Sequence, residues 1–501
     1  MSSDLRFRDV SKTYGHHKVL RHVDLDIPAG SFVALMGANG AGKTTLLRMA
    51  AGLATPTKGQ VTLADVDLRS AGPGLRRMIG FVSHDGLLYG DLTGRQNLMF
   101  HGRLFGVVDP EARIEELAEA LDLRKVLDRP ASVLSRGNKQ RLTLARALMH
   151  GPDVLFLDEP FTGLDEASSS RLVTLLKRLH AEGSTIVMTV HEAARAADGP
   201  TRLVVIGEGG VLVDEEIATS DATAESVTAV ELALVGAGAS TGGTGVASYV
   251  GLPAAEPAPA PLLGQPTLVP PPGRMRAAGL IALKDMRVEM RSRDALTSAA
   301  LFALTVLITA SFTSIPGQTS SGLSEGILWI SLLFAVLLGV GRSMTRESKD
   351  RAMEGLLLSP APRESVFLGK LLSALVMMAM IELFIVPAFL VLATGEAKGR
   401  ELDLPLLVAV VLLATLGLVV IATLLSGIAV GSRLGESLLP LIVMPIVIPL
   451  LIAAVETTRH ALGAESGASV DVIQWLALMA GFDAVVGLAA VATFSFVVED
   501  Q

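Results

Sequence analysis

Apolar residues are distributed differently in the two halves of this chain. Up to about residue 217, short apolar runs alternate with charged and polar segments. From about residue 296, apolar runs of membrane-spanning length follow one another. The first pattern is typical of a soluble α/β domain, and the second is typical of an all-α membrane domain.

Two short apolar runs in the first half predict strands that are buried on both faces of a parallel sheet. Phe32 to Met36 leads into a glycine-rich loop, and Val154 to Leu157 ends in the acidic pair Asp158-Glu159. Ligands of such sheets bind at the carboxyl ends of the strands. We therefore expect the functional groups of this domain to follow these two strands.

Six apolar runs in the second half are each long enough to cross a membrane core of about 30 Å. They span residues 296–315, 323–341, 365–393, 404–431, 437–455 and 472–498. The preceding segment, residues 275–294, mixes basic and apolar residues and is predicted to be an amphipathic helix on the membrane surface. Because Lys and Arg concentrate before the first run and after the second, both ends of this half are expected in the cytoplasm.

The segment between the halves, residues 219–273, is rich in Ala, Gly, Ser, Thr and Pro. Such a composition predicts a flexible linker, which would let the soluble domain dock under its own membrane half or that of a second copy. The chain thus divides into a soluble domain at 1–218, this linker, and a membrane domain at 274–501.

The composition of the chain limits which classes of partner and site are expected. The net charge of −8 argues against nucleic acid as the main partner, because phosphate-backbone binding requires clustered Lys and Arg. The chain has no cysteine, which excludes disulfides and thiolate metal sites. The polar first residues, MSSDLRFRDV, carry no signal-peptide pattern, so we expect the N-terminal domain to stay in the cytoplasm.

The glycine-rich loop has the spacing G-x-x-x-x-G-K-T between Gly37 and Thr44. In such a loop, backbone N–H groups and a helix N-terminus bind phosphates, the Lys reaches the outer phosphates, and the Thr hydroxyl ligates Mg²⁺. The alternative is an ordinary strand-to-helix turn that needs glycine for its geometry. The residues expected to contact a nucleotide are Gly37, Ala38, Asn39, Gly40, Ala41, Gly42, Lys43, Thr44 and Thr45.

The acidic pair after the second strand suits the hydrolysis of that nucleotide. We expect Asp158 to hold Mg²⁺ through water, and Glu159 to orient or deprotonate the water that attacks the γ-phosphate. A merely polar strand end is the alternative. Ser135 is a good N-cap, so the helix that follows it offers a second anion-binding end.

These motifs resemble those of the ATP-binding cassette (ABC) ATPases. Three further features share the resemblance, namely the segment Leu134 to Asn138, the turn Gly163-Leu164-Asp165, and His191 after an apolar run. The resemblance implies a homodimer in which each ATP is sandwiched between two cassettes, with Ser135 and Gly137 on the γ-phosphate held by the other subunit. It further implies that His191 senses the γ-phosphate, Tyr14 stacks on adenine and Asp165 belongs to the nucleotide site.

The sequence departs from this family at two positions. His84 stands where the family usually has a Gln that touches Mg²⁺, and its imidazole can accept a hydrogen bond from metal-bound water. Arg136 stands where Gly is commoner, and it either reaches a phosphate or is solvated.

Residues 275–498 resemble the B-type permease of the cytochrome c maturation (haem exporter) ABC system. Three stretches carry this resemblance, namely Gly326 to Ile330, Leu356 to Pro360 and the prolines Pro440, Pro445 and Pro449. The whole chain then reads as an α/β P-loop ABC ATPase domain followed by an all-α six-helix transmembrane domain.

The resemblance implies a role in haem export or c-type cytochrome biogenesis in a bacterial plasma membrane, with other maturation subunits and a haem chaperone as partners. Two alternatives stay open: a general exporter of a lipid, drug or polysaccharide, and an ATP-driven membrane remodelling or chaperone-release module that transports nothing.

Two further features concern coupling and transport. Arg342 to Glu354 is charged and helical in pattern, and we expect it either to dock into the cassette beside His84 or to be a solvated positive-inside loop. Glu382 and Asp483 fall in the middle of predicted spans, where ionisable groups usually face a partner or a pathway.

Overall fold

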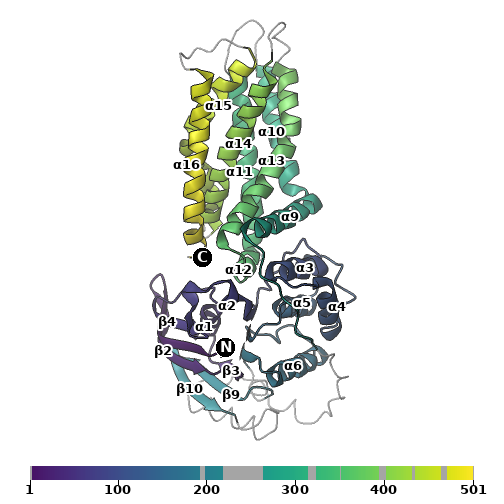
Figure 1. Ribbon diagram of the computed structural model, residues 1–501, viewed down its shortest axis with the longest axis vertical. Helices are drawn as coiled ribbons and strands as arrows, with labels where there is room; N and C mark the ends of the chain where they lie inside the picture. The colour runs from purple at the N-terminus through teal and green to yellow at the C-terminus, as the bar shows by residue number, and fades with distance from the viewer. Residues whose placement is uncertain are drawn as a thin grey trace. The chain divides into compact units, whose positions relative to one another are not determined.

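The computed structural model describes residues 3–191, 198–217, 263–313, 323–349, 351–393, 402–430, 435–463 and 471–499. The chain forms two compact units (Figure 1). The cassette unit comprises Met1–Pro272 and Asp350–Ala361, and the helical unit comprises Gly273–Lys349 and Pro362–Gln501.

The cassette unit is built on a six-stranded sheet with the strand order β10-β9-β3-β8-β7-β6. Neighbouring strands from β9 to β6 are parallel, and β10 is antiparallel to β9. Every residue of β3, β6, β7 and β8 is buried, which confirms the strands predicted from the apolar runs. The strands are β3 (Phe32–Met36), β6 (Ile79–Val82), β7 (Val154–Leu157), β8 (Thr185–Thr189), β9 (Arg202–Gly207) and β10 (Gly210–Glu216).

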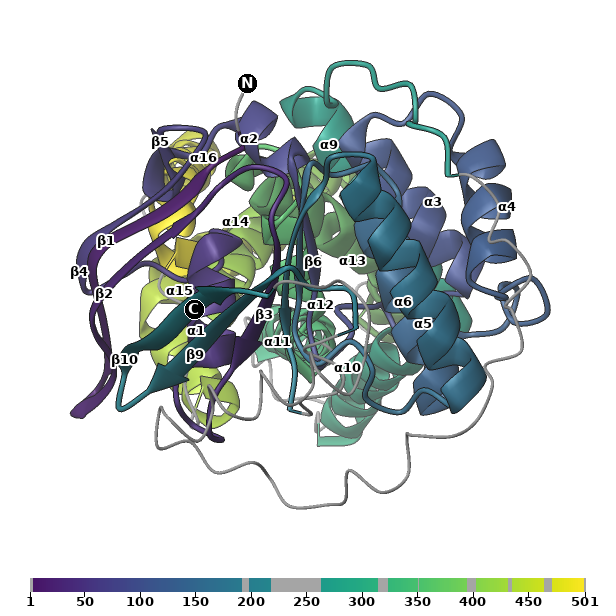
Figure 2. The same cartoon turned by 90° about the horizontal axis from the view of Figure 1, so that it is seen from below.

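A second, antiparallel sheet has the order β2-β1-β4-β5. Its strands are β1 (Leu5–Tyr14), β2 (His17–Ile27), β4 (Lys58–Leu63) and β5 (Val66–Asp67). Side chains of β1 and β2 share one buried cluster with those of β3 and of helix α1 (Lys43–Ala50). Figure 2 shows this sheet on one side of the parallel strands, with α3 to α6 on the other.

The remaining helices of this unit are α2 (Pro73–Arg77), α3 (Gly94–Phe105), α4 (Pro110–Ala120), α5 (Arg136–Leu148) and α6 (Glu166–Ala181). Local sequence sets their ends: Thr93 and Gln96 form a capping box at the start of α3, and Gly106 ends it at φ 77°. Leu142 and Leu148 of α5 pack with Leu172 and Leu176 of α6 in one core cluster.

The end of the predicted linker is folded. Residues 263–272 lie on the cassette unit, where Val269 N donates to Gly106 O (2.8 Å) and Val108 N donates to Thr267 O (3.0 Å). Leu263 is buried in the cassette core. The prediction of a flexible linker is therefore wrong for these ten residues, because an apolar anchor and backbone pairing offset the composition. Residues 218–262 lie outside the described part of the chain.

The helical unit consists of long helices, with α9 (Arg274–Ser292) where the amphipathic helix was predicted. The six others coincide with the six predicted spans. They are α10 (Asp294–Thr313), α11 (Leu323–Lys349), α13 (Arg363–Ala393), α14 (Leu404–Val430), α15 (Gly435–Ala461) and α16 (Val472–Glu499).

Within the described residues, four helices are by themselves long and apolar enough to cross a membrane, namely α13 to α16. A fifth candidate is the pair α9 and α10, which is bent by 70°. The apolar part of α11, Glu325–Gly341, is shorter than a typical span of about 20 residues. Within the described residues, four to five of the six predicted spans thus meet this measure, and α11 also lies where a span is predicted.

Helix α9 also differs from the predicted surface helix. The Lys284 side chain is buried, and its Nζ lies 2.6 Å from Asp285 Oδ1. The other Asp285 oxygen lies 3.1 Å from Nζ of Lys370 on α13. This buried cluster fastens α9 to α13, which a pattern of alternating basic and apolar residues does not reveal.

The two acids predicted in mid-span are both buried, each with 8% of its surface exposed. Glu382 accepts a hydrogen bond from Thr415 of the neighbouring helix α14. Asp483 packs against Gly417, where an added Cβ would lie 2.4 Å from Asp483 Oδ1. Helices α13 and α16 thus each present a carboxyl group to α14, inside the unit.

Candidate nucleotide site

The glycine-rich loop follows β3 directly and opens α1. Gly37, Gly40 and Gly42 have φ values of 143°, 83° and 102°, a region that L-residues rarely occupy. At Gly37 an added Cβ would lie 2.1 Å from Ile206 O, so this position has no room for any other residue. No side chain caps the N-terminus of α1. Its first N–H groups therefore remain available for an anion, as the loop pattern predicts.

Lys43 lies within this loop, with 7% of its surface exposed. Its Nζ donates to Gly37 O (2.7 Å) and to Ala38 O (3.1 Å). Burial lowers the pKa of the Lys43 ammonium below its ordinary value of 10.5, and the carboxylates of Glu159 and Asp158 oppose that shift. The lysine thus lies against the loop near both acidic residues, while the neighbouring Thr44 side chain is exposed.

Asp158 follows β7 and is 4% exposed. Its Oδ1 accepts a hydrogen bond from Thr189 Oγ1 (2.9 Å), at the end of the adjacent strand β8. The same Thr189 oxygen accepts from Glu159 N (2.7 Å). One hydroxyl therefore positions both acidic residues. The sequence does not single out Thr189 as a site residue, because its only signal is a polar residue at the end of an apolar strand.

Glu159 and His191 meet as the family resemblance implies. His191 Nε2 lies 2.8 Å from Glu159 Oε1, and Thr162 Oγ1 donates to Glu159 Oε2 (3.2 Å). Burial raises the pKa of Glu159, but the hydrogen bonds from His191 and Thr162 outweigh it and hold the pKa below the ordinary 4.5. Glu159 also has φ 51°, a strained value for a residue other than Gly. The carboxylate is thus ionised at neutral pH and fixed in orientation.

The segment Leu134 to Asn138, called the signature below, precedes and begins α5. Ser135 caps this helix, with its Oγ accepting from Asn138 N (3.3 Å). An added Cβ on Gly137 would lie 2.9 Å from Gly163 O, so the signature packs directly on the turn before α6. Asp165 in that turn caps α6 by accepting from Ser168 N (2.7 Å), which holds the pKa of Asp165 below its usual range. In this chain Asp165 has a structural role that the sequence analysis did not assign.

Arg136 and His84, the two departures from the family pattern, contact each other. Arg136 Nη2 lies 3.2 Å from His84 Nε2. Because a guanidinium has no acceptor, the imidazole must accept this hydrogen bond through Nε2. His84 Nδ1 in turn lies 3.7 Å from Asp85 Oδ1. Arg136 is exposed, which agrees with the alternative that it is solvated, and its contact with a phosphate stays a prediction.

Tyr14 ends β1 and is 48% exposed. The Nζ atom of Lys12 lies 4.8 Å from the centre of the Tyr14 ring, over one of its faces. An exposed ring in this position is able to stack on a base, and its role as the adenine contact stays a prediction.

The residues expected to hold Mg²⁺ fit a site that shares its ligands with a nucleotide. Asp158 supplies one buried carboxylate near Lys43, and the exposed Thr44 hydroxyl lies at the start of α1. Among the described residues, no group of three or more His, Asp or Glu side chains lies close enough to hold a metal by itself. Phosphate oxygens and water would complete the coordination, as Mg²⁺ commonly requires. His84 as a metal contact stays a prediction, since its Nε2 is paired with Arg136.

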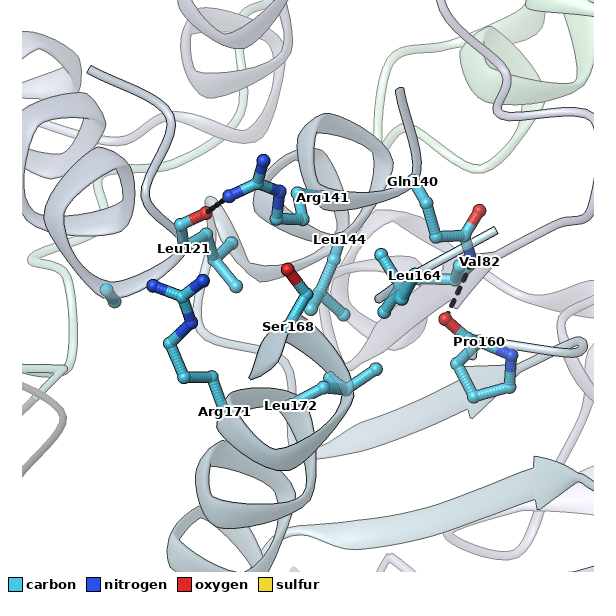
Figure 3. A pocket seen from close by; sticks show the side chains of 11 residues that line it. Val82, Leu121, Gln140, Arg141, Leu144, Pro160, Leu164, Ser168, Arg171 and Leu172 are labelled. Atoms are coloured by element: carbon cyan, nitrogen blue, oxygen red, sulfur yellow. Dashed lines mark hydrogen bonds between the residues drawn. The ribbon is translucent and has the colours of Figure 1, made fainter. Parts of the chain in front are cut away.

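A small, partly open pocket lies between α5 and α6 (Figure 3). Gln140 Nε2 donates to Pro160 O (3.2 Å) at one end, and Arg141 Nη1 donates to Leu121 O (3.2 Å) at the other. None of the predicted nucleotide-binding residues lines it. The Gln140 contact links α5 to the residue after Glu159, so one end of the pocket lies next to the acidic pair in the chain.

Residues 351–358 pack on the cassette next to these elements. Helix α12 (Ala352–Leu357) places Glu354 Oε2 2.8 Å from Nη1 of Arg48 on α1. Just before it, Arg351 Nη1 lies 3.1 Å from Asp85 Oδ2, and just after it Leu358 is buried in the cassette core. These contacts agree with the expectation that Arg342 to Glu354 docks beside His84. The side chains of residues 342–350 lie outside the described part of the chain.

Comparison with known proteins supports both halves of this description. Residues 20–162 match the family described as ABC transporter, and residues 276–498 match the family described as CcmB protein. The Nod factor export ATP-binding protein I of Cupriavidus metallidurans is 37% identical over 227 residues, which cover 43% of this chain and 75% of that protein. The ABC transporter ATP-binding protein NatA of Bacillus subtilis is 38% identical over 190 residues, covering 37% of this chain and 76% of that protein.

Among solved structures, an ATP-binding cassette determined as a dimer with ADP and phosphate is 28% identical, with a TM-score of 0.40. The match covers 42% of this chain and 98% of that one. From the relatives, the matched families and the arrangement of the phosphate loop, acidic pair and histidine, we conclude that the chain belongs to the ABC transporter family, with an ATP-hydrolysing cassette fused to a CcmB-family domain.

Proposed function

We propose that this protein is an ATP-driven membrane complex that acts in haem export or c-type cytochrome biogenesis. The observation that carries the proposal is the fusion of an ABC cassette to a region that matches the CcmB protein family over residues 276–498. The proposed location is a bacterial plasma membrane, with several spans in contact with lipid and the cassette and both termini in the cytoplasm. Other maturation subunits and a haem chaperone are the proposed partners, and nucleic acid is not.

In the proposed cycle, two copies of the chain bind ATP between their cassettes. Lys43 and the loop from Gly37 to Thr45 bind the phosphates of one chain's ATP, and Ser135, Arg136 and Gly137 contribute from the other chain. Mg²⁺, when bound, would neutralise charge on the phosphates, with Thr44 and Asp158 as its protein ligands. Glu159 then takes a proton from the attacking water, and His191 holds the carboxylate in place.

Coupling to the membrane domain is proposed to run through α12. Glu354 of α12 pairs with Arg48 of α1, the helix that begins at the phosphate loop. Arg351, just before α12, pairs with Asp85, which neighbours His84 in the chain. A change at the phosphate loop or at His84 therefore has a direct mechanical route to α12. Leu358 in the cassette core keeps the segment attached while these contacts rearrange.

The test is a chromosomal deletion scored for c-type cytochromes by haem staining of membrane proteins. Complementation with the wild-type gene should restore the stained bands, and complementation with Glu159→Gln should not. Normal cytochrome content in the deletion strain would refute the haem role and leave the ATPase assignment untouched.

A second candidate is an exporter of a lipid, drug or polysaccharide. It is favoured by the names of the cassette's relatives, several of which are Nod factor export proteins. A deletion strain with normal cytochromes that becomes sensitive to, or accumulates, an amphiphilic compound would support this function. A strain that lacks cytochromes although haem still crosses the membrane would instead support a chaperone-release module that transports nothing.

A further inference from the structure

The folded end of the linker, residues 263–272, forms a strap across the cassette. Its centre pairs with the segment after α3, in an antiparallel bridge between Val107 and Leu268. The two backbone hydrogen bonds that flank this bridge, at 2.8 and 3.0 Å, have ordinary strand geometry. Figure 2 shows the segment passing along α3 and α4.

Side chains fasten both ends of the strap. At its start, Arg113 Nη1 donates to Gly264 O (2.7 Å), and Glu116 accepts from Gly264 N. Arg113 is only 5% exposed and also donates to Leu148 O at the end of α5 (2.9 Å). At its end, Arg77 of α2 donates to Val269 O (2.8 Å). The strap therefore joins the helical part of the cassette to the sheet-bearing part.

The cassette surface is shaped to receive this segment. Gly106 has φ 77°, and an added Cβ there would lie 2.5 Å from Val269 O. Gly151 has φ 61°, and a Cβ there would lie 2.5 Å from the side chain of Gln265 and 2.7 Å from Pro266. Two glycines thus permit a close approach of the strap that side chains would block. Together with the buried Leu263, they make a site for an extended peptide.

The strap shortens the part of the linker that can connect the cassette to the membrane domain. The long segment between Ile217 and Leu263 begins and ends on the same cassette, because Ile217 N bonds to Thr201 O (2.8 Å) and Leu263 lies in the cassette core. After the last strap hydrogen bond at Val269, only Pro270, Pro271, Pro272 and Gly273 precede α9. The five Cα-to-Cα steps from Val269 to Arg274 span about 18 Å at most.

We infer that the strap ties each cassette to the membrane domain of its own chain, and that the low-complexity segment before it is not the tether. A 55-residue flexible tether would allow a cassette to serve either membrane domain of a dimer; a connection of four residues does not. This inference does not depend on what the protein transports.

The absence of cysteine from the chain makes a direct test possible. Val107 and Leu268 form the non-hydrogen-bonded pair of their bridge. The Cα atoms of such pairs typically lie about 4.5 Å apart, which is close enough for a disulfide. In the full-length V107C/L268C protein, mild oxidation should close this disulfide within one chain, giving a species of unchanged mass. ATPase activity should stay within about twofold of the reduced sample.

The matched control is V107C/V269C, in which the second cysteine is moved by one residue to the opposite face, so its disulfide yield should be much lower. Three results would overturn the inference. They are a disulfide-linked dimer at twice the chain mass of 52.3 kDa, equal yields for the two pairs, and ATPase activity that oxidation abolishes and reductant restores. The first would mean that the strap crosses to the other chain, and the last that it must detach in each cycle.

Discussion

At the scale of single residues, the catalytic end of the sheet depends on a few hydrogen bonds. Thr189 bonds to both acidic residues, and His191 and Thr162 hold the Glu159 carboxylate. This network holds Glu159, the proposed proton acceptor, in one orientation, and preorganisation of that kind lowers the barrier to hydrolysis.

Replacing the proton acceptor tests the assignment directly. Glu159→Gln keeps the shape of the side chain but removes its basicity, so ATP hydrolysis should fall by roughly 10²- to 10⁴-fold. ATP binding should be retained. Phosphate release and ATP-binding assays on the purified full-length protein measure the two effects, with Glu182→Gln, at the exposed end of α6, as a control. Near-normal hydrolysis by Glu159→Gln would contradict the role.

Stability in acid should depend on His150. This residue is buried, its Nε2 lies 3.0 Å from Ile79 O, and its ring stacks on Phe105. Burial lowers the pKa of His150 to about 3. The unfolded chain takes up a proton below about pH 6.5, whereas the folded chain does not until about pH 3, so the free energy of unfolding falls as the pH falls through this window. From pH 7 to pH 5 the loss is about 2 kcal/mol.

Thermal unfolding of the wild type and of His150→Gln at pH 7 and pH 5 measures this contribution. The variant should be less stable at pH 7, because it loses packing, but it should lose less stability on acidification. The exposed His17→Gln should behave as the wild type does. An identical pH dependence for His150→Gln and the wild type would contradict the assignment.

At the scale of elements, α12 belongs structurally to the cassette although its sequence lies in the membrane half. Its two ion pairs differ in exposure: Arg48 and Glu354 are 15% and 19% exposed, whereas Arg351 and Asp85 are 49% and 42% exposed. Solvent weakens exposed pairs, so the first pair should contribute most of the electrostatic attachment.

A double-mutant cycle measures how much each ion pair contributes to the attachment of α12. The single reversals Arg48→Glu and Glu354→Arg should each lower the thermal stability of the full-length protein, and the combined swap should recover a coupling free energy on the order of 1 kcal/mol. The same cycle with Arg351→Asp and Asp85→Arg should give less than about 0.5 kcal/mol. Equal coupling in the two cycles would show that burial does not govern the attachment of α12.

At the scale of the whole molecule, the family resemblance implies that each ATP lies between two cassettes. In that arrangement the signature residues of one chain contact the nucleotide held by the other chain. Ser135 and Gly137 are then useful only when a second cassette supplies ATP. A homodimer is accordingly the proposed active form.

The Glu159→Gln protein, which should not consume its ATP, makes the dimer measurable. In detergent with ATP and Mg²⁺, light scattering should give twice the mass of the chain, and Lys43→Ala should abolish the ATP-dependent increase. A Glu159→Gln protein that stays monomeric at saturating ATP would refute the shared-site mechanism.

The sequence alone was sufficient for the local features. The buried strands, the phosphate loop and the acidic strand end follow from short-range patterns, because backbone geometry and burial determine which residues can occupy them. The positions of the long apolar helices follow for the same reason. The bend of 70° between α9 and α10 does not follow from such patterns, because it depends on how the two helices pack.

Only the tertiary structure decided the contacts between residues distant in the chain. Thr189 beneath the acidic pair, Arg136 on His84, and the strap on the surface beside α3 each join segments with no common local pattern. The strap is the clearest case: its composition predicts a flexible chain, but Leu263 and the hydrogen bonds with Gly106 and Val108 order it. The composition of a segment indicates how much apolar surface it can bury by itself. A complementary surface elsewhere in the fold can provide the further apolar contacts and hydrogen bonds that order it.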